Sequence, residues 1–262
     1  MCLIALAWRT HPRYELALIA NRDEFHDRPA APAGADPLHP EVHGGRDLEQ
    51  GGSWLLVSAR GRLAAVTNVR AGPAGETAPR SRGALVRDFA TGAIGGAGFL
   101  DALAPSAAEY GRFNLLLWDG ATLMFGSNHP GFVGHAVAPG VHAMSNGAFD
   151  APWPKSGHAT RALRAWLESD LGAVASPDAL APLFAALADT TPAPDAALPD
   201  TGVGLALERA LSPPFVRGPR YGTRCSTVVL VAADAITFVE RRFGPDAQSL
   251  GESPATVPRT RA

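Results

Sequence analysis

Short runs of aliphatic residues, separated by turns rich in Gly, Pro and charged residues, predict antiparallel β-strands along much of the chain. The first two runs, 2–8 (CLIALAW) and 15–20 (ELALIA), are apolar at successive positions, which indicates strands buried on both faces. Later runs also come in pairs, most clearly around Asp119-Gly120, a dipeptide that favours tight hairpins. The expected strands are 2–8, 15–20, 54–58, 63–68, 113–118, 122–125, 141–145, 226–231 and 236–239.

Helical patterns fall between these groups of strands. Residues 83–103 have apolar positions at helical spacing, interrupted by the Gly-rich 92–98, and further helices are expected to begin at Ser156 and at Ser176-Pro177. This order of elements predicts an α+β fold in which helices cover two antiparallel sheets, a four-layer α/β/β/α sandwich. We expect one domain over residues 1–244 and a flexible tail over 245–262.

The connection at about 26–51 is long and has no predicted element. It contains four prolines and the three histidines His26, His39 and His43. A structureless connection of this length in a compact domain is typical of a functional or mobile loop. The segment is therefore predicted to be a lid.

Composition excludes several classes of protein. A net charge of −2 lacks the basic excess used to bind phosphate backbones, so nucleic acid is not expected as a partner. Two cysteines, Cys2 and Cys225, are too few for a disulfide framework, which favours a reducing, cytoplasmic setting. The opening apolar run is too short for a membrane span and lacks the pattern of a signal peptide.

Cys2 is the main candidate for chemistry, because phosphate-binding loops, zinc motifs and nucleophile elbows do not occur in the sequence. Removal of Met1 would leave a thiol and an α-amine on one residue. The amine titrates at about pH 8 and can act as the base for its own thiol. The alternative interpretation is a small hydrophobic residue buried at a strand end.

Polar residues cluster where four of the expected strands begin or end. Each cluster alone is typical of a turn or a cap, but strand ends of a sandwich can also converge on the start of the chain. The clusters are 21–24 (NRDE), 68–70 (NVR), 145–146 (SN) and 221–224 (YGTR).

With these clusters the sequence resembles the NRDE family, the family of the transport and Golgi organisation proteins, from residue 1 to about 243. That family is similar in fold to N-terminal-nucleophile hydrolases, including cysteine amidases that cleave conjugated bile acids and penicillin V. The resemblance implies a hydrolase that cleaves a non-peptide C–N bond of a small acylated molecule. The motifs are 1–2 (MC), 21–25 (NRDEF), 51–55 (GGSWL), 67–68 (TN), 81–83 (SRG), 113–115 (FNL), 145–146 (SN), 152–155 (PWPK) and 221–224 (YGTR).

The resemblance to the amidases implies roles for single residues. Cys2 takes the position of the nucleophile, and Asp23 takes the acidic position that holds the amine and the thiol. Asn68 and Asn146 match the amides that line the oxyanion site. Arg224 matches a late arginine near the thiol.

The position of Arg22 is left open by the sequence. Arg22 and Asp23 are adjacent, so simple alternation along a strand directs only one of them toward Cys2. Asn21 shares a face with Asp23 and competes with Arg22 for the place beside Cys2. The expected ligand-binding residues are Asn21, Arg22, Trp54 and Lys155.

A carrier is the alternative function, because family members are also associated with haem mobilisation and with lipid or acyl-coenzyme A metabolism. Hydrolysis would need no cofactor or metal, whereas the carrier would bind haem or an acyl-coenzyme A. Cys2 or the loop histidines His26, His39 and His43 are the candidates for an iron ligand. The expected partner is a small molecule, and a homodimer is left open.

Overall fold

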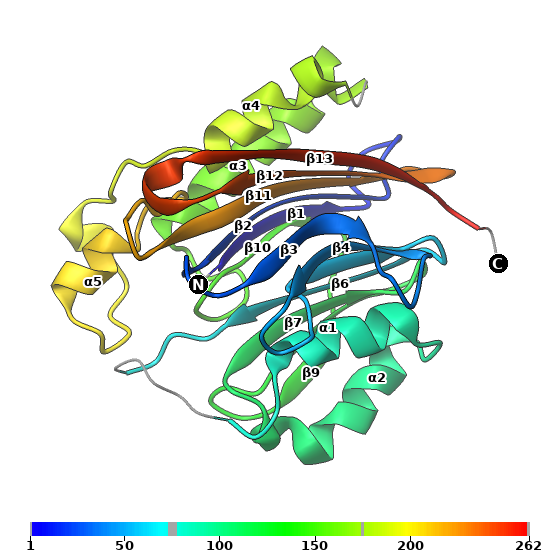
Figure 1. Cartoon of the computed structure of the whole chain (residues 1–262), viewed down its shortest axis with the longest axis horizontal. Helices are drawn as coiled ribbons and strands as arrows, with labels where there is room; N and C mark the ends of the chain where they lie inside the picture. Colours follow the sequence, from blue (N-terminus) through cyan, green and yellow to red (C-terminus); the bar gives the residue numbers. More distant parts are fainter. Residues whose placement is uncertain (1, 73–77, 174–175, 261–262) are drawn as a thin grey trace.

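The computed structural model describes residues 2–72, 78–173 and 176–260. Within these ranges the strands form a six-stranded sheet, in the order β10-β1-β2-β11-β12-β13, and a seven-stranded sheet, in the order β3-β4-β5-β6-β7-β8-β9. The two sheets pack face to face, with helices outside them (Figure 1). The strands are β1 (Cys2–Trp8), β2 (Leu16–Phe25), β3 (Ala30–Ala35), β4 (Val42–Asp47), β5 (Leu55–Ser58), β6 (Arg62–Asn68), β7 (Phe113–Trp118), β8 (Leu123–Ser127), β9 (Val133–Ala136), β10 (Gly140–Met144), β11 (Tyr221–Val231), β12 (Ala235–Phe243) and β13 (Ser249–Pro258).

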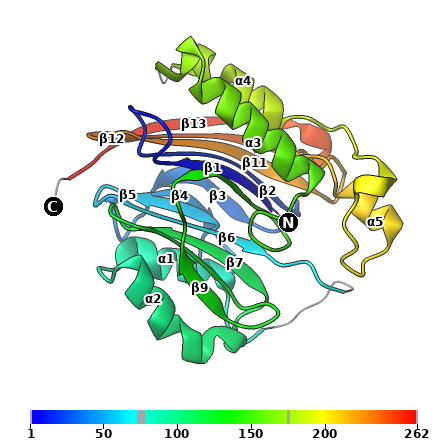
Figure 2. The same cartoon turned by 180° about the vertical axis from the view of Figure 1, so that it is seen from behind.

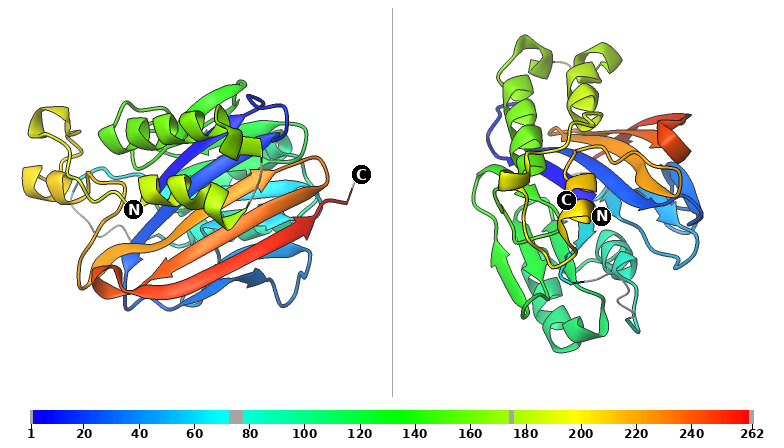
Figure 3. Two further views of the ribbon diagram at one scale, coloured as in Figure 1. Left: turned by 90° about the horizontal axis from the view of Figure 1, so that it is seen from above. Right: turned by 90° about the vertical axis from the view of Figure 1, so that its left-hand side faces the viewer.

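Two helices cover each outer face. The helices α1 (Arg82–Thr91) and α2 (Gly96–Leu103) pack on the seven-stranded sheet, as the reverse view shows (Figure 2). The helices α3 (Pro154–Leu167) and α4 (Pro177–Leu187) lie across the six-stranded sheet (Figure 3). The short α5 (Leu205–Ala210) lies at one end of the sandwich. The predicted four-layer α/β/β/α architecture is therefore confirmed.

The continuous apolar run of β2 reflects burial on both faces. Leu16 and Leu18 point into the core between the sheets, whereas Ala17 and Ile19 pack beneath α3 and α4. A strand in such a position reads as uninterrupted hydrophobic residues rather than as an alternation.

The prediction of a structureless lid at 26–51 is wrong. Residues 30–35 and 42–47 form the strands β3 and β4, which pair with each other at one edge of the seven-stranded sheet. These strands are rich in Ala and Gly and contain Pro32, so they lack the β-branched alternation by which strands are recognised.

The prediction of a flexible tail is also wrong for residues 249–258. They form β13, which pairs antiparallel with β12, so the expected boundary at 244 falls within a sheet. The edge strand β13 is largely exposed, and Pro254 and Pro258 limit pairing with a further strand.

Two smaller points concern the helices. Trp153, not Ser156, is the N-cap of α3, and Ser156 is buried within the first turn. Ser176 caps α4 as expected, since its side chain accepts a hydrogen bond from the backbone N–H of Ala179.

No helix in the described ranges is long and apolar enough to cross a membrane.

Candidate functional site

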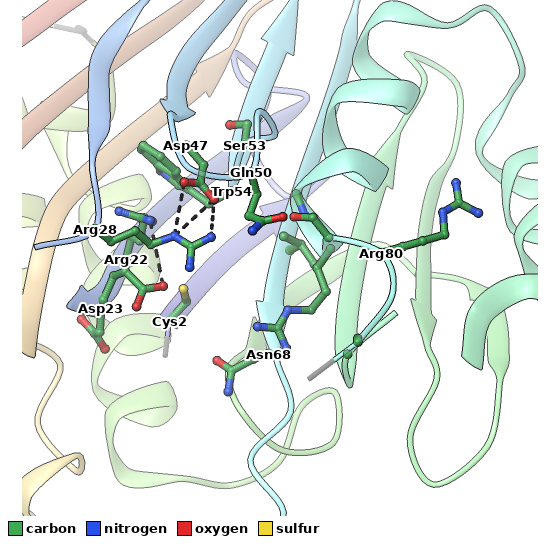
Figure 4. Close-up of a pocket in the computed structure, with 17 residues that line it drawn as sticks. Cys2, Arg22, Asp23, Arg28, Asp47, Gln50, Ser53, Trp54, Asn68 and Arg80 are labelled. Carbon is green, nitrogen blue, oxygen red and sulfur yellow. Dashed lines mark hydrogen bonds and ion pairs between the residues drawn. The ribbon is translucent and has the colours of Figure 1, made fainter. Parts of the chain in front are cut away.

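Cys2 lies at the first position of β1, directly opposite Arg22 of β2. Residues directly opposite each other in an antiparallel pair have side chains on one face, which here is the face toward the seven-stranded sheet. A cavity of about 260 Å³ opens at this point between the sheets and is lined by Cys2, Arg22, Asp23, Arg28, Trp54 and Asn68, among others (Figure 4). We refer to it as the inter-sheet cavity.

Arg22 lies directly opposite the first residue of β1. Its side chain is only 7% exposed, and its central carbon lies 4.2 Å from the centroid of the Trp54 ring. Nη2 is 4.0 Å from Glu24 Oε2, and Nη1 has no hydrogen-bond partner among the described residues. An unpaired buried N–H is costly, so Nη1 is a donor that the described residues leave unsatisfied.

Asp23 reaches the same cavity although it follows Arg22 directly. Arg22 is opposite the first residue of β1, so Asp23 lies beyond the end of that strand, and its charge acts on the Cys2 thiol. Asp23 Oδ1 accepts a 2.6 Å hydrogen bond from the Thr223 hydroxyl. Simple alternation, which admitted only one of Arg22 and Asp23, does not hold at this strand end.

Burial is the largest effect on the pKa values of Cys2 and Asp23. It raises the pKa of the Cys2 thiol, while the nearby charge of Arg22 acts in the opposite direction. Burial also raises the pKa of Asp23, and the charge of Lys155 is among the effects that oppose it.

The two predicted oxyanion amides occupy different depths. Asn68, at the end of β6, lines the inter-sheet cavity, whereas Asn146 is fully buried behind it. Asn146 Nδ2 donates to both the backbone oxygen and Oδ1 of Asn68, each at 3.0 Å. Asn146 therefore holds Asn68 instead of lining the cavity itself.

Arg224 is not among the described residues that line the inter-sheet cavity with Cys2. The register of β11 against β2 shifts between Thr223 and Cys225, so Cys225, not Arg224, is opposite Arg22. Arg224 Nη1 instead donates to the backbone oxygens of Phe25 (2.6 Å) and Arg28 (2.9 Å) and holds the turn after β2. The guanidinium beside Cys2 is that of Arg22, and the assignment of this position to Arg224 is corrected.

Asn21 is not placed to bind a ligand with its side chain. It is 1% exposed, and its Nδ2 donates to the backbone oxygens of Leu187 and Pro214, both at 2.8 Å. Its Oδ1 accepts from the Ser226 hydroxyl at 2.6 Å. These bonds lie on the helix-facing side of the sheet, so Asn21 joins β2 to the segments that cover it.

Of the other two predicted ligand-binding residues, Trp54 lines the inter-sheet cavity and Lys155 lies behind it. Lys155 is 2% exposed, in the first turn of α3. Its Nζ is 3.4 Å from both Asn146 Oδ1 and the backbone oxygen of Leu211.

Sequence reasoning missed the pair Arg28 and Asp47, which lines the cavity from the segment predicted to be a loop. Arg28 donates from Nε and Nη2 to the carboxylate of Asp47, with Nη2 2.6 Å from Oδ2. No local pattern joins these two residues, because the β3–β4 hairpin brings them together.

The start of α1 forms another wall of the cavity. Ser53 N donates to the backbone oxygen of Gly83 at 3.1 Å, and a Cβ at Gly52 would overlap the Gly83 backbone. The pair of glycines lets the backbone of 52–53 approach the helix closely. The residues of this contact belong to the motifs 51–55 (GGSWL) and 81–83 (SRG), which are the sequence features that point to it.

Cys225 and the loop histidines lie outside the cavity lining. Cys225 is 3% exposed, and burial raises the pKa of its thiol well above the usual value. None of His26, His39 and His43 is among the described residues that line the inter-sheet cavity. No group of three or more His, Cys, Asp and Glu among the described residues could hold a metal ion.

Sequence comparison identifies relatives along nearly the whole chain. A model of the family described as Transport and Golgi organisation 2 matches residues 1–245. The Transport and Golgi organization protein 2 homolog of Bos taurus is 35% identical over 262 residues, and that of Homo sapiens 33% over 261 residues. Each alignment covers 92% of this chain and 92% of the relative.

Solved structures with a similar fold are much more distant in sequence. Penicillin V acylase from Agrobacterium tumefaciens has a TM-score of 0.51 at 14% identity, covering 90% of this chain and 82% of that chain. A mutant of the conjugated bile acid hydrolase from Clostridium perfringens has a TM-score of 0.52 at 6% identity, covering 99% and 97%. The fold is therefore similar to that of N-terminal-nucleophile hydrolases.

Proposed function

The chain belongs to the Transport and Golgi organisation 2 family, and from this premise and the cavity at Cys2 we propose that it is a cysteine amidohydrolase. Its substrate is a small acylated molecule, and the bond cleaved is a non-peptide C–N bond. The observation that carries the proposal is the inter-sheet cavity, in which Cys2, Arg22, Asp23 and Asn68 meet.

The proposed reaction begins with removal of Met1, which gives Cys2 a free α-amine. The amine takes the thiol proton, and Asp23 holds the resulting ammonium group. The sulfur then attacks the substrate carbonyl, the C–N bond breaks, and the leaving amine carries away the proton. Water hydrolyses the thioester to release the acid and restore the thiol.

The charges of the cavity suit this sequence. Burial raises the pKa of the Cys2 thiol, so the resting form is protonated and needs a base. Arg22 lies beside the sulfur and favours the thiolate once the proton has moved. Asn68 Nδ2 has no acceptor in the described part of the chain and is available to the carbonyl oxygen that becomes negative.

Trapping of an acyl-enzyme tests the proposal. Protein shown by intact mass to lack Met1 is incubated with p-nitrophenyl acetate, and the mass is measured again. We expect one acetyl group on Cys2, with release of p-nitrophenolate, and no such adduct in Cys2→Ala. Acetylation of the Cys2→Ala protein at the same rate would refute the proposal.

A further inference from the structure

Lys155 contacts the predicted oxyanion site from behind, and no step of the proposed reaction uses it. We infer that Lys155 is a positioning residue that orients the hydrogen-bonded carboxamides of Asn146 and Asn68, so that Asn68 presents its N–H group to the inter-sheet cavity. This inference rests on the proposed hydrolase function. We call Lys155, Asn146 and Asn68 the amide relay.

The direction of the relay follows from the donors and acceptors available. A lysine ammonium group has three donors and no acceptor, so the atom of Asn146 that faces Nζ must be Oδ1. Asn146 Nδ2 is then directed to Asn68, where Oδ1 accepts it at 3.0 Å. With Oδ1 occupied in this way, the remaining polar atom of the Asn68 side chain is the donor Nδ2.

A carboxamide can otherwise turn over at little cost, since its oxygen and nitrogen have nearly the same shape. If Asn146 were reversed, Oδ1 would face Asn68, and Asn68 would turn its own oxygen to the cavity. An oxygen there would repel the developing oxyanion instead of stabilising it. The cation and the Ser145 hydroxyl, which both donate to Asn146 Oδ1, and the Asn68 backbone oxygen, which accepts from Asn146 Nδ2, together oppose the reversed arrangement.

Lys155 occupies a place that stability alone does not favour. It is 2% exposed, and it lies in the first turn of α3, where the helix dipole disfavours a positive charge. Its two polar contacts, Asn146 Oδ1 and the Leu211 oxygen, are neutral and long at 3.4 Å. A residue retained at such a cost is consistent with a role in the site.

Titratable groups on four elements or connections act on the Lys155 amine. Asp23 of β2, Cys2 of β1 and Glu208 of α5 favour its charged form, and Arg70, which follows β6, opposes it. Burial has the largest effect and lowers the pKa of Lys155. The ionisation of Lys155 is therefore linked to that of the nucleophile and its acidic partner.

Two reagents that react with Cys2 separate positioning of the oxyanion donor from thiol reactivity. Attack on p-nitrophenyl acetate creates an oxyanion, whereas displacement of iodide from iodoacetamide does not. The measured quantity is the ratio of the two rate constants, for wild type, Lys155→Met and the matched control Ser156→Ala. Ser156 is the next residue of the same helical turn and is also buried.

We expect Lys155→Met to lower this ratio by about 10²-fold, the usual effect of losing one oxyanion donor, and Ser156→Ala to leave it unchanged. Asn68→Ala should lower it to a similar extent, and the double variant Lys155→Met/Asn68→Ala should lower it no further. An unchanged ratio in Lys155→Met, with a lowered ratio in Asn68→Ala, would overturn the inference.

A second measurement tests the amide relay even if Lys155→Met does not fold or wild type is not acylated. Lys155 is the only lysine of the chain, so labelling with ¹⁵N-lysine gives one side-chain Nζ signal. That signal should move in Asn146→Ala and stay in place in Asn128→Ala, since Asn128 bonds to the Ala107 and Tyr110 oxygens elsewhere. A signal unmoved in Asn146→Ala overturns the relay, whereas alkylation of wild type without acylation removes the hydrolase proposal alone.

Discussion

Arg22 separates two cysteines that lie in one row across three strands, Cys2 on β1 and Cys225 on β11. Cys2 lines the inter-sheet cavity, whereas Cys225 is 3% exposed. The same residue type thus has two environments, and only the position of Cys2 at the very start of β1 distinguished it in the sequence.

Alkylation should follow this difference. Burial raises the pKa of both thiols, but Cys225 is also beside Glu240, and its pKa is raised well above the usual value. We expect iodoacetamide to modify Cys2 at least about ten-fold faster than Cys225, with a rate that rises with pH into the alkaline range. Peptide mapping after timed quenching measures both rates, and preferential labelling of Cys225 would contradict the assignment.

The buried carboxyl of Asp23 makes a prediction about stability. Burial raises its pKa, so folding favours the protonated form. This contribution is fully present below the unfolded pKa of about 3.9 and is lost as pH rises through the native pKa, with about 1.4 kcal/mol for each unit of the shift. Asp23→Asn should therefore unfold with less dependence on pH than wild type.

Urea unfolding across this pH range tests the point. Asp27→Asn is the matched control, because Asp27 is an exposed residue on the turn after β2. Its unfolding free energy should run parallel to that of wild type. Parallel curves for Asp23→Asn as well would show that Asp23 does not titrate differently in the native protein.

Among the elements, most strands in the middle of each sheet and the edge strand β10 were predictable, whereas the edge strands β3, β9 and β13, and β4 next to β3, were not. Runs such as 2–8 and 226–231 are buried on both faces and therefore read as continuous apolar sequence. The strand β9 is exposed throughout, and β13 is exposed along most of its length, so neither carries a hydrophobic pattern. β9 and β13 form because each pairs with a neighbouring strand, and the local sequence does not encode that pairing.

The bulge in β11 determines that Arg22, and not Arg224, is the arginine opposite Cys2 and Cys225. It places Cys225 opposite Arg22 and leaves Arg224 to bond the turn at 25–28. A one-residue shift of register moves side chains to the other face, and nothing in the letters YGTR marks where it occurs.

Substitution of the two arginines should therefore have different effects. Arg22→Gln removes the charge that lowers the pKa of Cys2, so alkylation of Cys2 at pH 7 should slow by on the order of ten-fold. Arg224→Gln should lower the free energy of unfolding by about 1–3 kcal/mol, because two backbone oxygens lose a charged donor. Alkylation rates and urea melts on both proteins decide between them, and a larger alkylation defect in Arg224→Gln would reverse the assignment.

At the scale of the whole molecule, the cavity depends on how closely the sheets and α1 approach one another. Gly52→Ala would place a Cβ against the Gly83 backbone, which cannot move without shifting the start of α1. We expect a loss of about 2 kcal/mol or more in the free energy of unfolding. Gly34→Ala is the control, since nothing lies within 4 Å of the added Cβ. Equal melting temperatures for the two variants would contradict the close contact.

The site illustrates which parts of a cavity a sequence reveals. Cys2, Asp23 and Asn68 were identified through motifs, but the depth of Asn146 and Lys155 and the pairing of Arg28 with Asp47 depend on contacts between the layers. Such contacts join residues far apart in the chain, and neither hydrophobic pattern nor spacing reports them.

The place of Cys2 at the mouth of the cavity also governs how the protein should be produced. Any affinity tag fused before Cys2 would start at the wall of the inter-sheet cavity and would convert the α-amine into a peptide bond. The end of β13, by contrast, is at an outer edge strand, and a tag added after it extends away from the site (Figure 1). Under the proposed mechanism, a protein with an N-terminal tag would fold and yet be inactive, so screens for substrates should use a C-terminal tag.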